Sequence, residues 1–427
     1  MKITRTLFIT LGSIFLLSNL LFAQKINNTD KIYDNNIVTV LLHAKGDQLS
    51  PAVMELNSDE KLELSFDDLS NKYYPFKYTF IHCTSDWKTS DLNPMDYIDG
   101  YFEGDINNYK FSFNTLTPYI HYHLIFPSDE MRPKLSGNYI LKVYIDDGSG
   151  PQMMFTRRFF VVESKVKTVA QVALQPKDLN FIYKKQQIDL QIHTSNTFSD
   201  DPEQRFTVNI RQNGRWDNAL MNLHPSSVTP NELYFDYPNG ILFDGGNEPR
   251  FFDLKSFRYL SQSVQKITPE NNYYKVILHT DYPRNKNSYE TYQNIHGKKL
   301  ITARNDQDPM LEGDYAKVNF SLKTAAFDNA SVYIIGALTD WILKPEGKMI
   351  YQPARQQYEG QILLKQGYYE YWYVVVPAGS HKGDITQIEG DHWETRNDYT
   401  IYVYYHERTP EYDRLVDVHQ ISALESQ

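Results

Sequence analysis

An apolar residue at every second position is the feature that most limits how this 427-residue chain can fold. Between Tyr139 and Ile145 every odd position is apolar or aromatic, and residues 188–192 and 316–322 repeat the alternation. Successive side chains of a strand point to opposite faces, so these segments are predicted to be strands with one solvated face. No stretch of twelve or more residues keeps a helical stripe. The pattern therefore predicts an all-β fold.

The strand-like segments are short and are separated by clusters of Gly, Pro, Asn and Asp. Such spacing favours tandem immunoglobulin-like β-sandwich domains. Polar stretches after residue 163 and at 305–309 mark the predicted boundaries. They divide the chain into an N-terminal domain (28–163), a middle β domain (164–308) and a C-terminal domain (309–427). The polar segment 280–296 is predicted to be a long loop with a function of its own.

The first 23 residues are typical of a secretory signal peptide. Lys2 and Arg5 precede an apolar run at 7–17, and the segment ends at Ala23 before a polar residue. This run is shorter than the ~20 apolar residues needed to span a bilayer, and no later stretch is as apolar. We therefore predict an exported periplasmic protein with no membrane insertion of its own. Cys83, the only cysteine, lies far beyond the signal, so neither a lipid anchor nor an intramolecular disulfide is expected.

The charge balance excludes one class of partner, and the aromatic content favours another. The chain has 43 Lys and Arg against 53 Asp and Glu, a net charge of -10. Nucleic acid needs a basic face and is therefore excluded as a partner. The 33 Tyr, 23 Phe and 5 Trp suit half-buried strand faces, and they equally suit protein interfaces.

Candidate catalytic and metal-binding residues are few. His121 and His123 lie two apart on a predicted strand and so share a face, but two ligands do not complete a zinc site. His82 and Cys83 are adjacent, so their side chains point to opposite faces and cannot form a nucleophilic pair. The sequence contains no nucleophile elbow, phosphate-binding loop or zincin motif. We predict no cofactor, no metal and no enzymatic activity.

One candidate ligand site lies near the C-terminus. Residues 330–341 read as a strand that ends in a turn at Asp340 and Trp341. This segment resembles the early-set sandwich modules that bind glycogen and starch, in which a matching tryptophan stacks on sugar rings. Trp341 and Trp372 are the predicted sugar platform, which makes a periplasmic carbohydrate-binding protein the alternative function. Trp341 equally suits a role in closing the end of the sandwich core.

A more extensive pattern spans nearly the whole chain. It includes YTFIHCTSDW at 78–87, YIDG at 97–100, SGNYILKVY at 136–144, RRFFV at 157–161 and EGDHWETRNDY at 389–399. With these motifs the chain resembles the plug proteins of the Bacteroidetes type IX secretion system. Tyr101 departs from the pattern, in which phenylalanine is expected.

The resemblance implies a periplasmic subunit that lies under a large outer-membrane translocon barrel and closes it when no substrate passes. Asp86, Trp87, Ser90 and Tyr97 fall in a connection between predicted strands, and we expect them to be exposed and to bind the partner. A local role is the alternative, in which Asp86 and Ser90 cap a turn and Trp87 covers the edge of the core.

Overall fold

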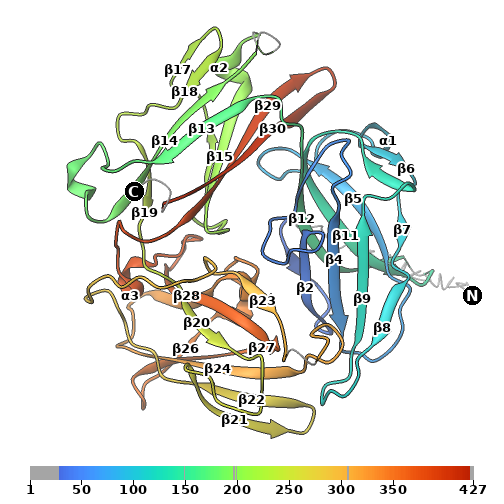
Figure 1. Ribbon diagram of the computed structural model, residues 1–427, viewed down its shortest axis with the longest axis vertical. Coiled ribbons are helices and arrows are strands. Elements are labelled where there is room, and N and C mark those ends of the chain that lie inside the picture. Colours follow the sequence, from blue (N-terminus) through green and yellow to red (C-terminus); the bar gives the residue numbers. More distant parts are fainter. Residues whose placement is uncertain (1–27, 149, 196–197, 199, 305–306, 424–427) are drawn as a thin grey trace, which may run out of the picture.

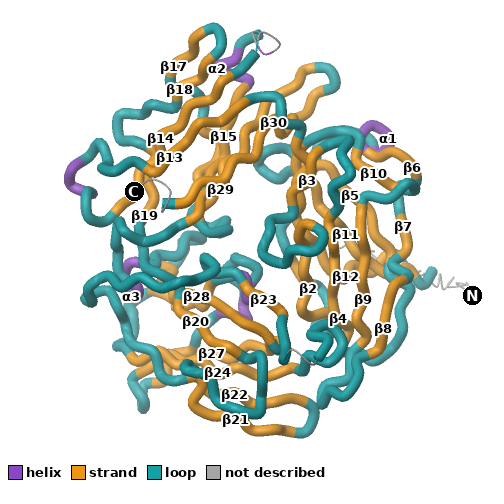
Figure 2. Tube along the Cα trace, in the orientation of Figure 1, coloured by secondary structure: helices purple, strands orange, loops and turns teal. Residues whose placement is uncertain are grey.

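The computed structural model describes residues 28–148, 150–195, 198, 200–304 and 307–423. The signal peptide predicted over 1–23 lies outside these residues. Strands dominate the described chain, which confirms the all-β prediction, and the helices are single turns. Figures 1 and 2 show the strands gathered in three bodies around a common centre. Among the described residues, no helix has the length and apolar character needed to cross a bilayer.

The N-terminal sandwich consists of two main sheets. In the first, the strand order is β1-β12-β11-β5-β7, and β3 pairs with β12. Its strands are β1 (Lys31–Ile32), β3 (Val53–Glu55), β5 (Lys77–Cys83), β7 (Gly104–Asp105), β11 (Gly137–Asp146) and β12 (Pro151–Val162). The second sheet, in the order β2-β4-β9-β8, contains β2 (Ile37–Ala44), β4 (Leu62–Asp68), β8 (Asn108–Phe111) and β9 (Ile120–Phe126). A small ribbon pairs β6 (Ile98–Gly100) with β10 (Met131–Pro133), and α1 (Pro94–Tyr97) precedes β6.

Aromatic side chains fill the space between these two sheets. Phe66 of β4 stacks on Tyr122 of β9, with ring centroids 5.1 Å apart. Phe155 of β12 approaches Phe66 edge-on at 4.9 Å from the opposite sheet. Rings bury more apolar area than aliphatic side chains do and hold defined geometries. The alternation seen in the sequence therefore produces a rigid core without a disulfide.

The middle sandwich combines strands from two separate parts of the chain. One sheet has the order β13-β14-β18-β17, with β19 on β14, and the other has the order β16-β15-β29-β30. The first contains β13 (Lys167–Val172), β14 (Lys185–His193), β17 (Ser227–Thr229), β18 (Glu232–Tyr234) and β19 (Ile241–Asp244). The second contains β15 (Phe206–Gln212), β16 (Leu220–Leu223), β29 (Asp398–Arg408) and β30 (Glu411–Ser422), with α2 (Pro202–Arg205) before β15.

A third sandwich lies in the chain between β19 and β29, and we call it the inserted sandwich. One sheet has the order β20-β28-β23, with β25 on β28, and the other has the order β21-β22-β24-β27-β26. The first contains β20 (Arg250–Asp253), β23 (Lys299–Ile301), β25 (Ala330–Ile335) and β28 (Gly367–Pro377). The second contains β21 (Val264–Glu270), β22 (Tyr273–Leu278), β24 (Tyr315–Lys323), β26 (Ile350–Gln352) and β27 (Gln357–Lys365), and α3 (Thr386–Glu389) follows the sandwich.

Strand pairing crosses the boundary predicted between 308 and 309. β22 and β24 pair across it, β23 pairs with β28, and β29 returns to β15 of the middle sandwich. The division into 164–308 and 309–427 therefore differs from the observed sheets. A polar, proline-containing stretch can be a linker between two sandwiches or a loop within one sandwich. Its composition is the same in both, so composition alone does not identify a domain boundary. At the other boundary, β12 ends at Val162 and β13 begins at Lys167.

The sandwiches contact one another through buried side chains. Between the N-terminal and middle sandwiches, an apolar cluster joins the outward faces of β5, β11 and β12 to those of β29 and β30. Its buried members are Cys83, Trp87, Ile140, Phe160, Val162, Tyr402, Tyr404 and Leu415. Leu41 of β2 extends into the core of the inserted sandwich. All three bodies are therefore packed together.

Candidate functional site

A row of exposed aromatic side chains follows the outer edge of the N-terminal sandwich. Tyr101 is 69% exposed, Phe111 60% and Phe113 70%. We call these three residues, with the exposed Phe102 and Tyr109, the aromatic strip. Figure 1 shows β6, β7 and β8 in succession along this edge, on the side away from the middle sandwich. Large exposed apolar groups that gather along one edge are typical of an interaction surface.

The strip results from the position of β8 in its sheet. β8 is an edge strand paired with β9, so Tyr109 lies opposite Tyr122 and Phe111 opposite Ile120. The rings of Tyr109 and Tyr73 are 4.9 Å apart, which extends the apolar surface onto the loop between β4 and β5. These residues were not among the contact residues predicted from the sequence, although Tyr109, Phe111 and Phe113 alternate. Alternation identifies a strand, but it does not show whether another sheet covers that face.

The structure buries Trp87, which sequence analysis expected to be exposed. The side chain is 5% exposed and packs edge-on against Phe160 and Trp216, with ring centroids 5.3 and 5.5 Å apart. The guanidinium of Arg158 lies 4.2 Å from the centroid of its ring. Its backbone has a φ of 67°, because the tight turn after β5 folds the indole into the interface with the middle sandwich. Trp87 therefore joins two sandwiches of this chain.

The other three predicted contact residues have local partners as well. Asp86 accepts a hydrogen bond from the Thr84 hydroxyl at 2.5 Å and pairs with Lys88, which is the turn-capping role named as the alternative. Ser90 donates to the backbone carbonyl of His82. Tyr97 is buried in the core of the N-terminal sandwich, so its expected exposure is wrong. A partner-binding role for these residues stays a prediction.

The tryptophans of the predicted sugar platform are packed together. Trp372 is 1% exposed and its indole N–H donates to the carbonyl of Asn247 at 2.7 Å. The half-buried Trp341 lies beside it, with ring centroids 6.2 Å apart. A buried ring offers no face to a sugar, so the two residues do not form an open platform in this structure. Trp341 packs against the cluster around Ile335, in line with a role at the end of the core.

The histidines and the cysteine have structural partners. His121 lies 2.6 Å from a carboxylate oxygen of Asp67, and His123 lies 3.0 Å from Glu63. The described residues contain no group of three or more His, Cys, Asp or Glu side chains placed to hold a metal ion. Burial lowers the pKa of His82 to about 4 and raises the pKa of Cys83 to about 12. A neutral thiol is a poor nucleophile, so this pair is not activated for catalysis.

The loop between β22 and β23, which contains the predicted functional segment 280–296, is bound to three buried carboxylates of the inserted sandwich. Glu248 accepts from the hydroxyl of Tyr289, Glu370 accepts from the backbone N–H groups of Ile295 and Gly297, and Glu389 pairs with Arg284. Hydrogen bonds to charged groups are about twice as strong as neutral ones. These contacts give the loop a structural role in covering one face of β28.

Glu370 makes the stability of this region depend on pH. Burial raises the pKa of its carboxyl to about 7, although the two backbone N–H groups oppose the shift. The folded state then holds the proton more tightly than the unfolded state, so the free energy of unfolding falls as pH rises from about 4.5 to about 7. Glutamine does not titrate, so in Glu370→Gln we expect the decrease in the free energy of unfolding over this pH range to be smaller by about 2–3 kcal/mol. Urea unfolding of both proteins at pH 5, 6, 7 and 8 measures the difference, and parallel pH profiles would contradict the prediction.

Comparison with known proteins identifies a family and a similar solved structure. Residues 37–163 match the model of the type 9 secretion system plug protein 1st domain. The crystal structure of a hypothetical protein from Parabacteroides merdae ATCC 43184 is 34% identical with a TM-score of 0.89, and the match covers 93% of this chain and 100% of that chain.

Two further comparisons add no functional information. The C-terminal domain of the Streptococcus pyogenes antigen I/II-family protein AspA is 7% identical with a TM-score of 0.16, over 90% of this chain and 98% of that chain. A TM-score this low does not indicate a shared fold. No curated protein matches the chain.

The family match covers the N-terminal sandwich, and the structural match covers 93% of the chain. The matched plug domain begins with β2 and ends one residue after β12, so it includes the aromatic strip. The Parabacteroides merdae protein extends the similarity over the other two sandwiches. This chain therefore belongs to the family of type 9 secretion system plug proteins, and its residues 37–163 are the first plug domain.

Proposed function

We propose that this protein is a non-enzymatic periplasmic subunit that binds the periplasmic opening of a large outer-membrane secretion barrel and occludes it when no substrate is exported. The membership of the plug family supports this function, and the aromatic strip on the matched domain is the observation that carries it. The strip is the contact surface in this proposal.

The physical properties of the strip suit a reversible contact. Aromatic side chains are enriched at protein interfaces because they bury large areas while few side-chain torsions are fixed. The strip lies on a sandwich whose core is packed with rings, so little backbone ordering is required on binding. The exposed carboxylates of Asp99, Glu103 and Asp105 lie close to Tyr101 and Phe102 in the sequence, which favours solubility when the partner is absent. The aromatic rings can therefore contact a partner, and the neighbouring carboxylates keep the surface soluble after the partner is released.

Removal of the strip is expected to weaken the complex with the barrel. In the variant Tyr101→Ser/Phe111→Ser/Phe113→Ser, we expect co-purification with the barrel from detergent-solubilised envelopes to fall by at least about tenfold, because three exposed anchors lose their buried area. The matched control replaces Tyr183 and Tyr259, which are equally exposed on the other two sandwiches, with serine. Equal recovery of the barrel with both variants would exclude the strip as the contact surface.

Occlusion is tested separately from binding. Cells that express only the strip variant should become permeable to large molecules that the intact outer membrane excludes, as cells without the protein should. The control variant should keep the membrane closed. If the control variant still binds the barrel but the outer membrane stays permeable, the protein binds the barrel without occluding it.

A further inference from the structure

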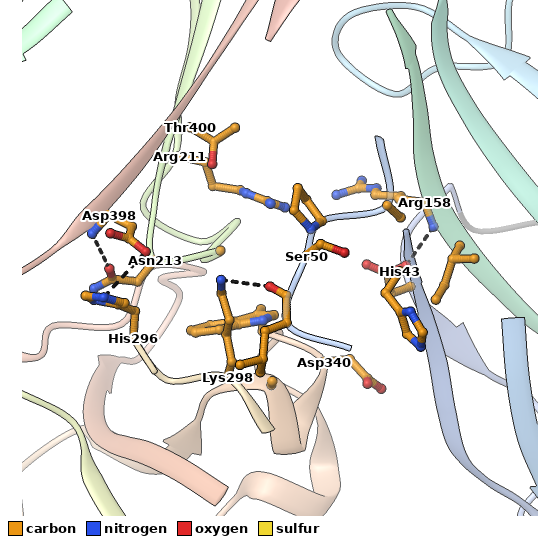
Figure 3. A pocket seen from close by; sticks show the side chains of 18 of the residues that line it. His43, Ser50, Arg158, Arg211, Asn213, His296, Lys298, Asp340, Asp398 and Thr400 are labelled. Carbon is orange, nitrogen blue, oxygen red and sulfur yellow. Dashed lines mark hydrogen bonds and ion pairs between the residues drawn. The ribbon is translucent and has the colours of Figure 1, made fainter. Parts of the chain in front are cut away.

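A cavity of about 400 Å³ lies at the junction of the three sandwiches. Figure 3 shows its walls, with Arg158 from β12, Arg211 from β15 and Lys298 from the residue before β23. Each sandwich thus contributes a cation to the same space. The volume lies within the range of roughly 300–1,000 Å³ that is typical of small-molecule sites, which often occur where domains meet.

The walls of the cavity are positively charged, although the chain as a whole is acidic. Lining side chains with a positive charge are Arg157, Arg158, Arg211, Lys298 and Lys299. Lining carboxylates are Asp30, Asp340 and Asp398. Cations that face one low-dielectric space repel one another, and a bound anion would offset this repulsion.

The carboxylates do not neutralise all of these cations. Asp340 lies 3.5 Å from Arg157 and 3.7 Å from Lys299, and it also pairs with Lys344 outside the cavity lining. Asp30 accepts from the backbone N–H of Arg158. The single negative charge of Asp340 is therefore shared among three cations and cannot neutralise all of them.

Arg211 and Lys298 are left without a carboxylate partner in the described part of the chain. The Nε atom of Arg211 is buried and has no hydrogen-bond acceptor among the described residues. The ammonium of Lys298 donates to the backbone carbonyl of Leu49 at 2.9 Å. A buried donor without an acceptor costs about 1–3 kcal/mol, so a ligand oxygen at Arg211 would remove a real penalty.

Aromatic rings hold the two arginines in position. The guanidinium carbons of Arg158 and Arg211 both lie 4.5 Å from the centroid of the Trp216 ring. Figure 3 shows the two side chains extending toward each other from opposite walls. Burial lowers the pKa of Arg158 to about 10; the charge of Asp30 opposes this shift and the charge of Arg211 adds to it. The Trp216 ring thus positions both guanidinium groups at the cavity, and a guanidinium is the side chain best suited to bind a carboxylate.

We propose that the junction cavity is a binding site for a small organic anion whose carboxylate groups lie between Arg211, Arg158 and Lys298. The body of the ligand contacts the rings of Trp216 and Trp341, which also line the cavity. Because the walls come from all three sandwiches, the ligand stabilises their mutual packing. The proposal does not depend on the plug function, because the cavity and the aromatic strip share no residue.

The probe is citrate, which carries several carboxylates and fits the charge of the site. Isothermal titration of the mature chain with citrate, at an ionic strength held constant with sodium chloride, should show saturable one-to-one binding and a matching rise in Tm. Inorganic phosphate provides the second arm, because tighter binding of phosphate than of citrate would identify a phosphate-bearing ligand instead and overturn the carboxylate assignment.

Variants connect the binding to the proposed residues. Arg211→Gln and Lys298→Gln are each expected to weaken citrate binding by about tenfold, while Arg211→Lys keeps the charge and should lose less. Lys266→Gln, at an exposed position on β21, is the control and should bind as the wild type does. Two opposite walls are tested, so misfolding of one variant leaves the other informative. Absence of saturable citrate binding by the wild type, or wild-type affinity in both glutamine variants, would refute the site.

Discussion

Replacing Asp67 with asparagine is expected to lower the free energy of unfolding by about 3–5 kcal/mol. Asp67 lies on β4 of the N-terminal sandwich, and its carboxylate is 2.6 Å from the ammonium of Lys365 on β27 of the inserted sandwich. Both side chains are fully buried. Tyr315 donates a hydrogen bond to the same carboxylate at 2.6 Å. The asparagine variant would leave the charge of Lys365 buried without a counterion at the interface of two sandwiches.

The same pair predicts a loss of stability in acid. Burial raises the pKa of the Asp67 carboxyl, but the charges of Lys365 and His121 outweigh this effect and hold the pKa below its usual range. A depressed folded-state pKa contributes stability that is fully present above the unfolded value of about 3.9 and is lost as pH falls through the folded value. The asparagine variant should therefore show a shallower decrease in stability below pH 4.

Urea unfolding measures this prediction, and two variants control it. In Asp67→Leu/Lys365→Met both charges are absent, so most of the lost stability should return. Arg355→Gln breaks the exposed pair with Glu359 and should change stability by less than about 0.5 kcal/mol. A loss below about 1 kcal/mol for Asp67→Asn would show that water or a local rearrangement compensates for the missing charge.

Glu389→Gln is expected to cost about 3 kcal/mol and to release the loop before β23. The carboxylate of Glu389 is buried and accepts from Arg250 at 3.0 Å, from Arg284 at 2.9 Å and from the backbone N–H of Tyr373 at 3.0 Å. Glutamine has the same shape but no charge, and its amide group directs N–H donors toward the two guanidinium groups. Arg250 would then keep Asp281 as its remaining carboxylate partner.

Hydrogen exchange locates this effect and unfolding measurements give its size. Amides of residues 284–297 should exchange faster in the variant, because Arg284 joins the loop to Glu389. The control is Glu290→Gln, an exposed glutamate of the same loop, which should change neither exchange nor stability measurably. Unchanged protection of the loop in Glu389→Gln would show that Glu248 and Glu370 hold it without Arg284.

The fold class was predictable because it depends on local pattern. Alternation between Tyr139 and Ile145 appears in the structure as part of β11, and the segments 188–192 and 316–322 lie in β14 and β24. A period of two is a property of a single strand, so it can be read without knowledge of the partner strand. The family motifs also depend on the order of residues alone, and the domain match over 37–163 agrees with them.

The location of the candidate sites was not predictable in this way. Trp87 and Phe111 are both aromatic residues near strand ends, yet Trp87 lies against the middle sandwich while Phe111 lies on an open edge. Exposure depends on which sheet covers a face, and that is decided by contacts between residues far apart in the chain. The same reason explains why Trp372 is covered and why the boundary at 308/309 differs from the observed sheets.

The sequence by itself determined the strands, the absence of a possible intramolecular disulfide and the resemblance to plug proteins, because each follows from residue identity or from short-range order. Only the tertiary structure decided which aromatic residues remain in water and which cations share a cavity. Arg158, Arg211 and Lys298 are widely separated in sequence, and no single motif contains all three. They meet because the chain leaves the middle sandwich, builds the inserted one and returns, so that three packed bodies enclose a space that belongs to none of them alone.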